Sequence, residues 1–360
     1  MRDLFEAVGR RALFVFDPET AHGLSIAALK TGAPLGCRPK ADARLETRVA
    51  GLTFPNPLGM AAGFDKNAEV PAALLRLGFG FAEVGTVTPL PQKGNPKPRI
   101  FRLMRDQAVI NRLGFNNEGH DAAFARLSSL PAGRGIVGVN IGANKDADDR
   151  IADYESGVGR FAAVASYLTV NISSPNTPGL RNLQGRDQLA GLLSRVAEAR
   201  AASARPDIAI FLKIAPDLHE GDLDDVAAEV SSHGIDGVVI SNTTLSRAGL
   251  SASEKSEAGG LSGRPLFARS TAMLARMRQK LGPHLALIGV GGVASAETAA
   301  EKIRAGADLV QLYTGMIFAG PALPGRIVGG LSAILDREGA ASFADLRDSR
   351  LAHWAAVPLD

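Results

Sequence analysis

Apolar and amphipathic segments alternate along the chain from about residue 45. Helical periodicity, with apolar residues three or four positions apart, marks the segments 69–78, 186–202, 222–234 and 297–306. Other segments are apolar almost throughout, which is typical of parallel strands covered on both faces. They are 56–63, 80–88, 135–142, 166–173, 208–216, 236–244, 285–292 and 308–315. These eight repeats predict an α/β fold, a closed (β/α)8 TIM barrel over residues 45–340, in preference to an open doubly wound sheet.

The first forty residues do not follow this alternation and predict a small N-terminal two-helix extension over residues 1–40. Residues 3–16 place their apolar side chains on one helical face, and Asp17-Pro18 is a capping sequence for a second helix that ends near Lys30. The apolar face consists of Leu4, Phe5, Val8, Ala12, Val15 and Phe16. This pattern alone favours a helical hairpin packed on the barrel over a helix lying on a membrane. Residues 341–360 are expected to form a C-terminal tail.

Composition and charge exclude several classes of protein. The net charge is +3, aromatic residues make up 5%, and no dense block of Lys and Arg occurs, so nucleic acid is not an expected partner. The six histidines lack metal-ligand spacing, and the single cysteine, Cys37, lies in a polar linker, so neither a metal site nor an internal disulfide is expected. No segment approaches the roughly 20 apolar residues of a membrane-spanning helix, and the chain does not begin with a signal peptide. We therefore expect a soluble or peripheral protein of the cytoplasm.

Polar residues collect where the apolar segments end, which is the catalytic face of a (β/α)8 barrel. The segments 77–88, 233–244 and 305–315 repeat one order, in which a glycine precedes a strand and hydroxyl or amide side chains follow it. Long insertions at 89–117 and 244–264 also follow strand ends. We expect these insertions to form lids or walls of a site.

Two lysines near the strand ends indicate a ligand that carries negative charge or carbonyl groups. Lys213 is flanked by Leu212 and Ile214, so burial would disfavour its charge unless a partner is present. A structural ion pair with a barrel carboxylate is one interpretation of Lys213, but a role beside a ligand that becomes anionic is favoured. Lys66 follows the small residues of AAGFD, where a flat ligand can approach the backbone closely.

The ends of the last two predicted strands favour a phosphate site. Gly-Gly occurs in the segment 287–293, and Tyr313-Thr314 ends the following strand. Barrels commonly bind phosphate there through backbone N–H groups at the start of a helix. The segment 261–266 could add a third helix start, or Ser262 could be a plain N-cap.

Asparagines near the strand ends favour a planar, uncharged polar ring as the substrate, because amides both donate and accept hydrogen bonds. They are Asn111, Asn116, Asn140, Asn171, Asn176 and Asn242. Together with the phosphate site and the buried lysine, they suit FMN beside a heterocyclic substrate. Ser174 is the proton acceptor that remains, because no histidine and no carboxylate other than Asp65 stands at a strand end.

Several motifs resemble the dihydroorotate dehydrogenase family, and in particular its membrane-associated, quinone-reducing class. In order along the chain they are NPLGMAAGFDKN, GTVTP, NRLGFNN, NISSPNTPGLR, ISNTT, GGLSGRPL, IGVGG and QLYTG. The resemblance extends from the N-terminal helices to about residue 335. It implies an FMN-containing (β/α)8 enzyme that oxidises dihydroorotate to orotate in pyrimidine synthesis and passes the electrons to a quinone. It also implies that residues 1–40 contact the cytoplasmic side of the inner membrane and admit the quinone, and a monomer is expected.

The resemblance assigns roles residue by residue. Ser174 would be the base that takes the C5 proton while a hydride leaves C6, where the cytosolic class has a cysteine. The orotate ring and its carboxylate would be held by Lys66, Asn111, Arg112, Leu113, Gly114, Phe115, Asn171, Asn176, Asn242 and Thr243. FMN would be held by Ala62, Gly63, Phe64, Asp65, Lys66, Thr86, Asn140, Asn171, Lys213, Ser241, Gly263, Gly292, Tyr313 and Thr314. Ser241 departs from the threonine of well-known relatives, but either hydroxyl can donate to a flavin.

Two other functions stay open on the residues alone. Another FMN barrel, such as a 2-hydroxy acid oxidase, would use a histidine base and substrate-binding arginines. A barrel without catalytic activity could bind a nucleotide as a sensor or scaffold. Reduction of the flavin by a small carboxylate would favour the first, and failure to take up FMN would favour the second.

Overall fold

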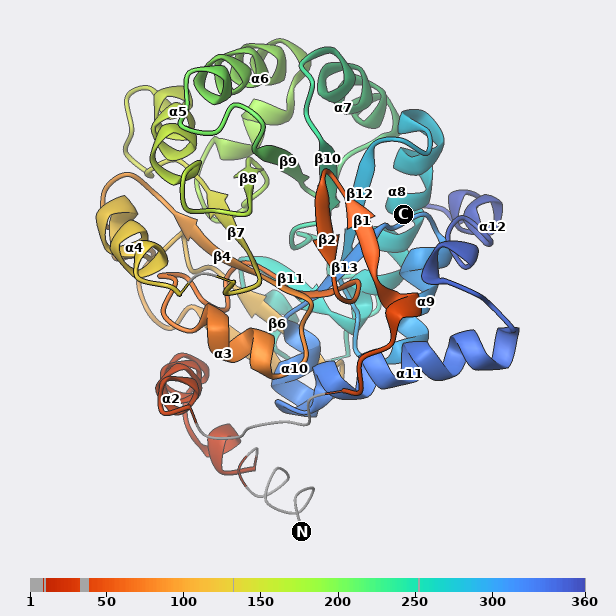
Figure 1. The fold of residues 1–360 in the computed structure, drawn as a ribbon. Helices are drawn as coiled ribbons and strands as arrows, with labels where there is room; N and C mark the ends of the chain where they lie inside the picture. Colours follow the sequence, from red (N-terminus) through yellow and green to blue (C-terminus); the bar gives the residue numbers. More distant parts are fainter. Residues whose placement is uncertain (1–8, 10, 33–38, 132, 252, 360) are drawn as a thin grey trace.

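The barrel at the centre of the molecule is built from the eight predicted apolar segments (Figure 1). The structure is a computed structural model and describes residues 9, 11–32, 39–131, 133–251 and 253–359. Neighbouring barrel strands are parallel, and the sheet closes in the order in which the strands follow one another in the chain. The strands are β3 (Leu58–Met60), β4 (Phe81–Val87), β7 (Ile136–Ile141), β8 (Tyr167–Asn171), β9 (Ala209–Ile214), β10 (Gly237–Ile240), β12 (Ala286–Val290) and β13 (Leu309–Leu312). The predicted (β/α)8 TIM barrel is confirmed.

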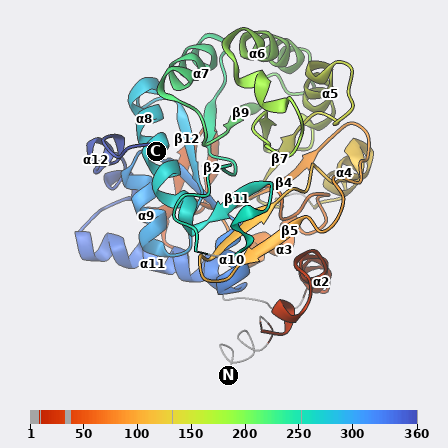
Figure 2. The ribbon, with the colours of Figure 1, turned by 180° about the vertical axis from the view of Figure 1, so that it is seen from behind.

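Helices surround the barrel on its outer side (Figures 1 and 2). They are the six-residue α3 (Pro71–Arg76) and the longer α4 (Gly119–Ser128), α5 (Arg150–Phe161), α6 (Arg186–Ala201), α7 (Glu220–Ser232), α8 (Phe267–Leu281), α9 (Ala296–Arg304) and α11 (Leu323–Glu338). Short helices are η1 (Ala43–Leu45), η2 (Leu180–Gln184), η3 (Ser253–Ser256), η4 (Arg264–Leu266), α10 (Thr314–Ala319), η5 (Phe343–Asp345) and α12 (Leu351–Ala355). The predicted helical segments coincide with α3, α6, α7 and α9 to within about two residues at each end. Among the described residues, no helix is long and apolar enough to cross a membrane.

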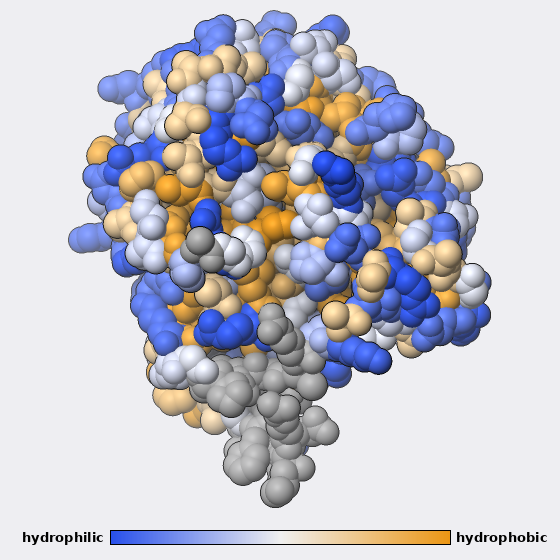
Figure 3. Space-filling view, in the orientation of Figure 1, coloured by the Kyte–Doolittle hydropathy of each residue, from blue (hydrophilic) through white to orange (hydrophobic). Residues whose placement is uncertain are grey.

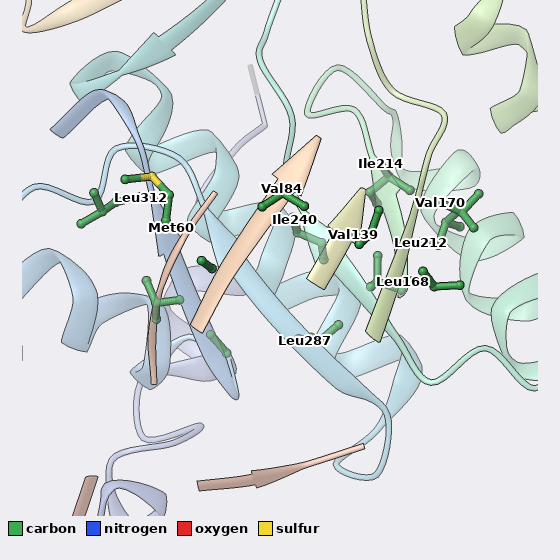
Figure 4. Close-up of a cluster of buried hydrophobic side chains, with 14 of the residues drawn as sticks. Met60, Val84, Val139, Leu168, Val170, Leu212, Ile214, Ile240, Leu287 and Leu312 are labelled. Carbon is green, nitrogen blue, oxygen red and sulfur yellow. The ribbon is translucent and has the colours of Figure 1, made fainter. Parts of the chain in front are cut away.

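Two hydrophobic layers hold the barrel together. The outer layer lies between strands and helices, and Figure 4 shows strand residues that belong to it, such as Val84, Leu168 and Ile240. The inner layer fills the barrel with side chains that include Tyr167 and Phe211, whose rings meet edge to face with centroids 5.3 Å apart. Because side chains fill its interior, the barrel is a packed core, and its functional sites lie at the strand ends.

The two ends of the barrel are covered by different elements (Figures 1 and 2). An antiparallel hairpin of β1 (Thr47–Val49) and β2 (Leu52–Phe54) covers one end, where the rings of Phe54 and Phe81 have centroids 5.1 Å apart. At the other end the two insertions join in an antiparallel sheet of order β11-β6-β5. Its strands are β5 (Ile100–Leu103), β6 (Ala108–Asn111) and β11 (Gly260–Gly263). The sequence pattern predicts lids or walls from the insertions, but it predicts neither the hairpin nor this sheet.

The described part of the N-terminal extension consists of helical residues 11–15 and α2 (Pro18–Lys30), which contacts α3 and β5. Asp17 caps α2, as predicted, because its carboxylate accepts two backbone N–H groups at 3.1 Å. Glu19 joins α2 to the first insertion through an ion pair with Arg99 at 2.6 Å. The predicted apolar-face residues Leu4, Phe5 and Val8, and the predicted linker residue Cys37, lie outside the described residues.

The C-terminal segment packs on the barrel helices. The Trp354 ring of α12 meets the Phe267 ring of α8 edge to face with centroids 5.8 Å apart. Arg276 of α8 donates a hydrogen bond to the Ala355 carbonyl at 3.2 Å.

Figure 3 shows the face that carries the β1–β2 hairpin, where hydrophilic residues dominate the periphery and hydrophobic ones gather toward the middle.

Candidate active site

A cavity of about 720 Å³ opens at the carboxyl ends of the barrel strands, a size typical of cofactor and substrate sites. Its wall combines strand ends with residues of both insertions, α2 and α10. The predicted site residues that line it are Ala62, Gly63, Phe64, Lys66, Thr86, Asn111, Leu113, Gly114, Phe115, Asn171, Ser174, Asn176, Lys213, Ser241, Asn242, Thr243, Gly263, Gly292, Tyr313 and Thr314. Asn116 lines it as well. The fold thus gathers residues from distant parts of the chain around one space.

Three predicted site residues lie outside the cavity wall. Arg112 donates to the Glu257 carboxylate at 2.6 Å, which joins the two insertions. Asp65 is fully buried, and its carboxylate accepts the backbone N–H groups of residues 69–70 at 2.8 and 2.7 Å. Burial raises the pKa of Asp65, although these hydrogen bonds oppose the shift. Asn140 is fully buried below the wall, within hydrogen-bond reach of residues that line it. The side chains of Arg112, Asp65 and Asn140 thus make hydrogen bonds within the protein that fix the residues around the cavity.

Amide side chains form a continuous hydrogen-bonded network at the bottom of the cavity. Asn242 Nδ2 donates to Asn171 Oδ1 at 3.3 Å, and Asn171 Nδ2 donates to Asn140 Oδ1 at 3.1 Å. Asn171 Nδ2 also donates to Thr86 Oγ1 at 2.9 Å, and the Thr86 hydroxyl donates to Asn140 Oδ1 at 2.5 Å. Each amide is thereby fixed in one orientation, which presents donors and acceptors at set positions to a ligand.

Ser174 lies on the loop after β8 and is 5% exposed at the cavity wall. Its Oγ accepts the N–H of Asn176 at 3.2 Å. Arg181 positions this loop, because Nε donates to the Ser173 carbonyl and Nη2 to the Thr243 carbonyl, both at 3.0 Å. The many polar groups of NISSPNTPG therefore bind across to neighbouring loops and hold Ser174 at the cavity.

The first insertion closes over the same loop. Asn95 Nδ2 donates to the Asn176 carbonyl at 3.1 Å, and Asn176 Nδ2 donates to Asn111 Oδ1 at 3.3 Å. Gly114 has φ 71°, and a Cβ atom there would lie 2.8 Å from the Asn95 side chain. A glycine is needed at this position because the backbone passes so close to Asn95, which belongs to the same insertion.

Two lysines line the cavity, the buried Lys213 and the half-buried Lys66. Lys213, 5% exposed, forms no hydrogen bond or ion pair with any residue of the described chain. Burial lowers the pKa of Lys213, and the field of Glu83 in β4 partly opposes the shift. Burial likewise lowers the pKa of Lys66 to about 8. Both are side chains whose charge an anionic ligand would stabilise.

His22 of α2 also lines the cavity, and the sequence analysis did not identify it. Its Nε2 lies 3.5 Å from Lys66 Nζ, and its Nδ1 lies 3.4 Å from the Tyr313 hydroxyl. Burial, reinforced by the Lys66 charge, lowers the pKa of His22 to about 3, so the ring is neutral at physiological pH. The sequence carries no signal for this contact, since α2 and the strand ends are distant along the chain. Among the described residues no cluster of His, Cys, Asp or Glu is suited to a metal ion.

One end of the cavity is polar and rich in glycine. Gly263, Gly291 and Gly292 have φ values of 99°, 108° and 74°, which favour glycine. A Cβ atom at Gly292 would lie 2.4 Å from a side-chain atom of α8. Ser262 is a strand residue of β11 whose hydroxyl accepts a hydrogen bond from Thr314 at 2.8 Å, so it is not an N-cap. These glycines are needed because the backbone packs closely against neighbouring elements, and all three line the cavity.

The part of the cavity wall formed by residues 13–14, α2 and α10 is apolar and is called the apolar arm. It is lined by Leu13, Phe14, Ala21, Leu24, Ala28, Leu29, Met316 and Ile317. Val15 and Phe16, next to this arm in the chain, are 83% and 47% exposed. An apolar ligand could enter the arm from this side.

The chain is similar over its full length to known dihydroorotate dehydrogenases. The family model described as dihydroorotate dehydrogenase matches residues 44–335. Proteins named dihydroorotate dehydrogenase (quinone) are 67% identical in Mesorhizobium japonicum, over 99% of both chains, and 65% identical in Brucella ovis, over 100% of both. The crystal structure of ligand-free DHODH from Eimeria tenella superposes with a TM-score of 0.88 at 40% identity, over 92% of this chain and 99% of that one. The chain therefore belongs to the dihydroorotate dehydrogenase family, within its quinone-dependent class.

Proposed function

We propose that this chain holds FMN and dihydroorotate side by side in the strand-end cavity, and thereby oxidises dihydroorotate to orotate with a membrane quinone as the final electron acceptor. Family membership carries the coarser part of this statement. The chain is a quinone-dependent dihydroorotate dehydrogenase, an oxidoreductase of pyrimidine biosynthesis and a flavin enzyme. That membership excludes the 2-hydroxy acid oxidase and the catalytically silent barrel. The identity of the flavin and the roles of individual residues rest on the geometry of the site.

The shape and charge of the cavity fit FMN. Gly263, Gly292 and Thr314 would take the phosphate, because all three line the cavity and backbone N–H groups bind phosphate well. Lys213 would lie against the isoalloxazine ring, where its unpaired ammonium group would stabilise negative charge. When bound, FMN supplies the hydride acceptor for C6 of the substrate and the electrons for the quinone.

The amides and Lys66 fit dihydroorotate. Between them, Asn111, Asn176 and Asn242 offer both donors and acceptors to the ring's two N–H and two C=O groups. Lys66 would bind the substrate carboxylate, which would give its desolvated ammonium group a negatively charged partner. Closure of the insertion around Gly114 would exclude water from the reacting atoms.

Ser174 would take the proton from C5. Its Oγ would receive that proton while its own hydroxyl proton passes onward, so that the substrate loses one proton and one hydride in total. Thr177 is suited to be the next acceptor, because its hydroxyl is buried and has no hydrogen-bond partner within the described structure. Arg181 holds the loop in place throughout.

The apolar arm would admit the quinone. Apolar side chains of α2 and α10 would surround the quinone head, and the exposed Val15 and Phe16 would face the acyl region of a membrane. We propose a peripheral monomer on the cytoplasmic side of the inner membrane, without a nucleic-acid partner.

One observation carries the proposal: Ser174, the amide network and the unpaired Lys213 line the same cavity. The test is anaerobic mixing of the FMN-loaded protein with dihydroorotate, followed by the loss of flavin absorbance. A Ser174→Ala variant should retain FMN and reduce it several orders of magnitude more slowly at neutral pH. Ser173→Ala is the comparison variant, because it removes a neighbouring hydroxyl that does not line the cavity; this hydroxyl donates to Asn171 at 2.9 Å and accepts from Asn242 at 3.0 Å, so a moderate loss of substrate affinity is expected but not the loss of Ser174→Ala. Reduction at the wild-type rate in Ser174→Ala would remove Ser174 from the reaction.

A further inference from the structure

Glu83 of β4 is a carboxylate inside the barrel that the proposed function does not use. It is fully buried. Asn140 Nδ2 donates to Oε1 at 2.8 Å, while the Tyr167 hydroxyl, the Thr169 hydroxyl and Gln311 Nε2 donate to Oε2 at 3.0, 3.2 and 2.8 Å. Four donors therefore converge on this one carboxylate.

The strands are arranged to bring these donors together. Gly138 pairs with both Glu83 and Tyr167, and a Cβ atom at Gly138 would lie 2.1 Å from the Tyr167 ring. The glycine therefore leaves room for the phenol to reach the carboxylate. Gln311 turns its NH2 group to Glu83 while its own Oε1 has no hydrogen-bond partner within the described structure. The carboxylate's need for donors thus decides the orientation of this amide.

The same need sets the orientation of the amide network under the cavity. Asn140 donates to Glu83 through Nδ2, so its Oδ1 is turned to Asn171. Asn171 must then donate through Nδ2 and accept from Asn242 through Oδ1. The three amides form a directional chain, Asn242 to Asn171 to Asn140, that ends on Glu83.

Glu83 also acts on Lys213 without contacting it. The two groups form no ion pair within 4 Å, and Glu83 is the one described group whose charge shifts the titration of Lys213. The titratable group in contact with Glu83 is Tyr167, which stays neutral because burial raises its pKa well above its usual value. Lys213 therefore keeps a countercharge behind it while its N–H donors stay free for a ligand.

We propose that Glu83 is a positioning residue for the reaction, because it fixes the donor and acceptor faces of the asparagine chain and supplies the buried countercharge of Lys213. This inference rests on the proposed function. Its effect reaches the substrate through Asn171 and Asn242, and the flavin through Lys213.

The test replaces Glu83 by an amide of the same shape in the FMN-loaded protein. Glu83→Gln removes the charge and can donate as well as accept, so the direction of the chain is no longer fixed. We expect full FMN occupancy, an orotate Kd raised about tenfold or more in titrations followed by the flavin spectrum, and a similarly slower flavin reduction. The alkaline limit of flavin reduction should move to lower pH by about one unit, because Lys213 loses the field that favours its charged form.

Thr169→Val is the matched control, because it removes one donor to Glu83 but keeps the carboxylate, its charge and the amide chain. Orotate affinity and the pH profile of this variant should stay within about twofold of wild type. If Glu83→Gln does not fold, Asn140→Ala cuts the chain below Asn171 and keeps Glu83, so it should weaken orotate binding and leave the alkaline limit unchanged. Three results would overturn the proposal. The first is a Glu83→Gln variant whose orotate affinity and pH profile equal those of wild type. The others are a Thr169→Val variant with losses equal to those of Glu83→Gln, and an Asn140→Ala variant with wild-type orotate affinity. A wild-type protein that binds neither FMN nor orotate would instead refute the proposed function.

Discussion

The lowered pKa of Lys66 leads to a quantitative prediction for the pH dependence of orotate binding. Lys66 is half-buried at the cavity wall, and its Nζ lies 3.5 Å from Nε2 of the neutral His22. Burial lowers the pKa of Lys66 to about 8, while the fields of Glu19, Asp65 and Glu69 oppose the shift and that of Arg99 adds to it. At pH 7 about nine-tenths of the molecules carry the ammonium group, and at pH 9 about one-tenth do.

This charge controls orotate affinity if the ammonium group binds the carboxylate. Binding then raises the pKa of Lys66, so complex formation takes up a proton above pH 8 and affinity falls as the pH rises. The Kd of orotate should double near pH 8 and rise about tenfold by pH 9, which is about 1.4 kcal/mol per pH unit. Spectral titrations of the FMN-loaded protein from pH 6.5 to 9.5 measure this Kd. Calorimetry in two buffers of different ionisation enthalpy measures the proton uptake.

Lys66→Arg is the matched control, because a guanidinium group stays charged throughout this range. Its orotate Kd should change little with pH, apart from the titration of orotate itself. A wild-type Kd that is constant to pH 9.5, or a Lys66→Arg variant that loses affinity in parallel, would show that Lys66 does not hold the carboxylate.

Two further predictions concern regions outside the reacting centre. Removal of residues 1–37 should leave flavin reduction by dihydroorotate within about twofold but lower turnover with a long-tailed quinone about tenfold or more, because the apolar arm loses the wall formed by α2; equal quinone rates in both proteins would rule out this route. Lys302 is fully buried, and burial holds its pKa well below the usual value, so the folded state binds fewer protons than the unfolded state and stability falls as the pH drops below 10.5. The stability of Lys302→Met relative to wild type should therefore increase by up to about 1.4 kcal/mol per pH unit as the pH falls from 10. Urea unfolding of both proteins at pH 9 and pH 7 measures this, and a stability difference that is the same at both pH values would contradict a neutral Lys302.

The sequence predicted the barrel because each of its strands is buried on both faces, which leaves an almost continuous apolar segment. The apolar pattern did not predict the β1–β2 hairpin, because its strands Thr47–Val49 and Leu52–Phe54 are short and partly exposed. It did not predict the sheet β11-β6-β5 for another reason. Its central pairing joins residues 108–111 with 260–263, and no local pattern encodes a contact between positions so far apart.

The candidate site followed a similar division. Strand-end positions such as Ser174 and Asn242 were predictable, since parallel strands deliver their ends to one face of the barrel. His22 was not, because its place depends on how α2 docks. Glu83 carried the same signal as Lys213, a charged residue within an apolar strand, yet only the structure places its four donors.

The proposed oxidation of dihydroorotate requires that the substrate ring lies between the flavin and the Ser174 hydroxyl. A crystal structure of the FMN-loaded protein with orotate measures it directly. We predict that Ser174 Oγ lies about 3.5 Å or less from C5 of orotate, with the carboxylate at Lys66 and the flavin on the opposite face of the ring. Orotate bound away from the flavin, or with C5 turned from Ser174, would contradict the account.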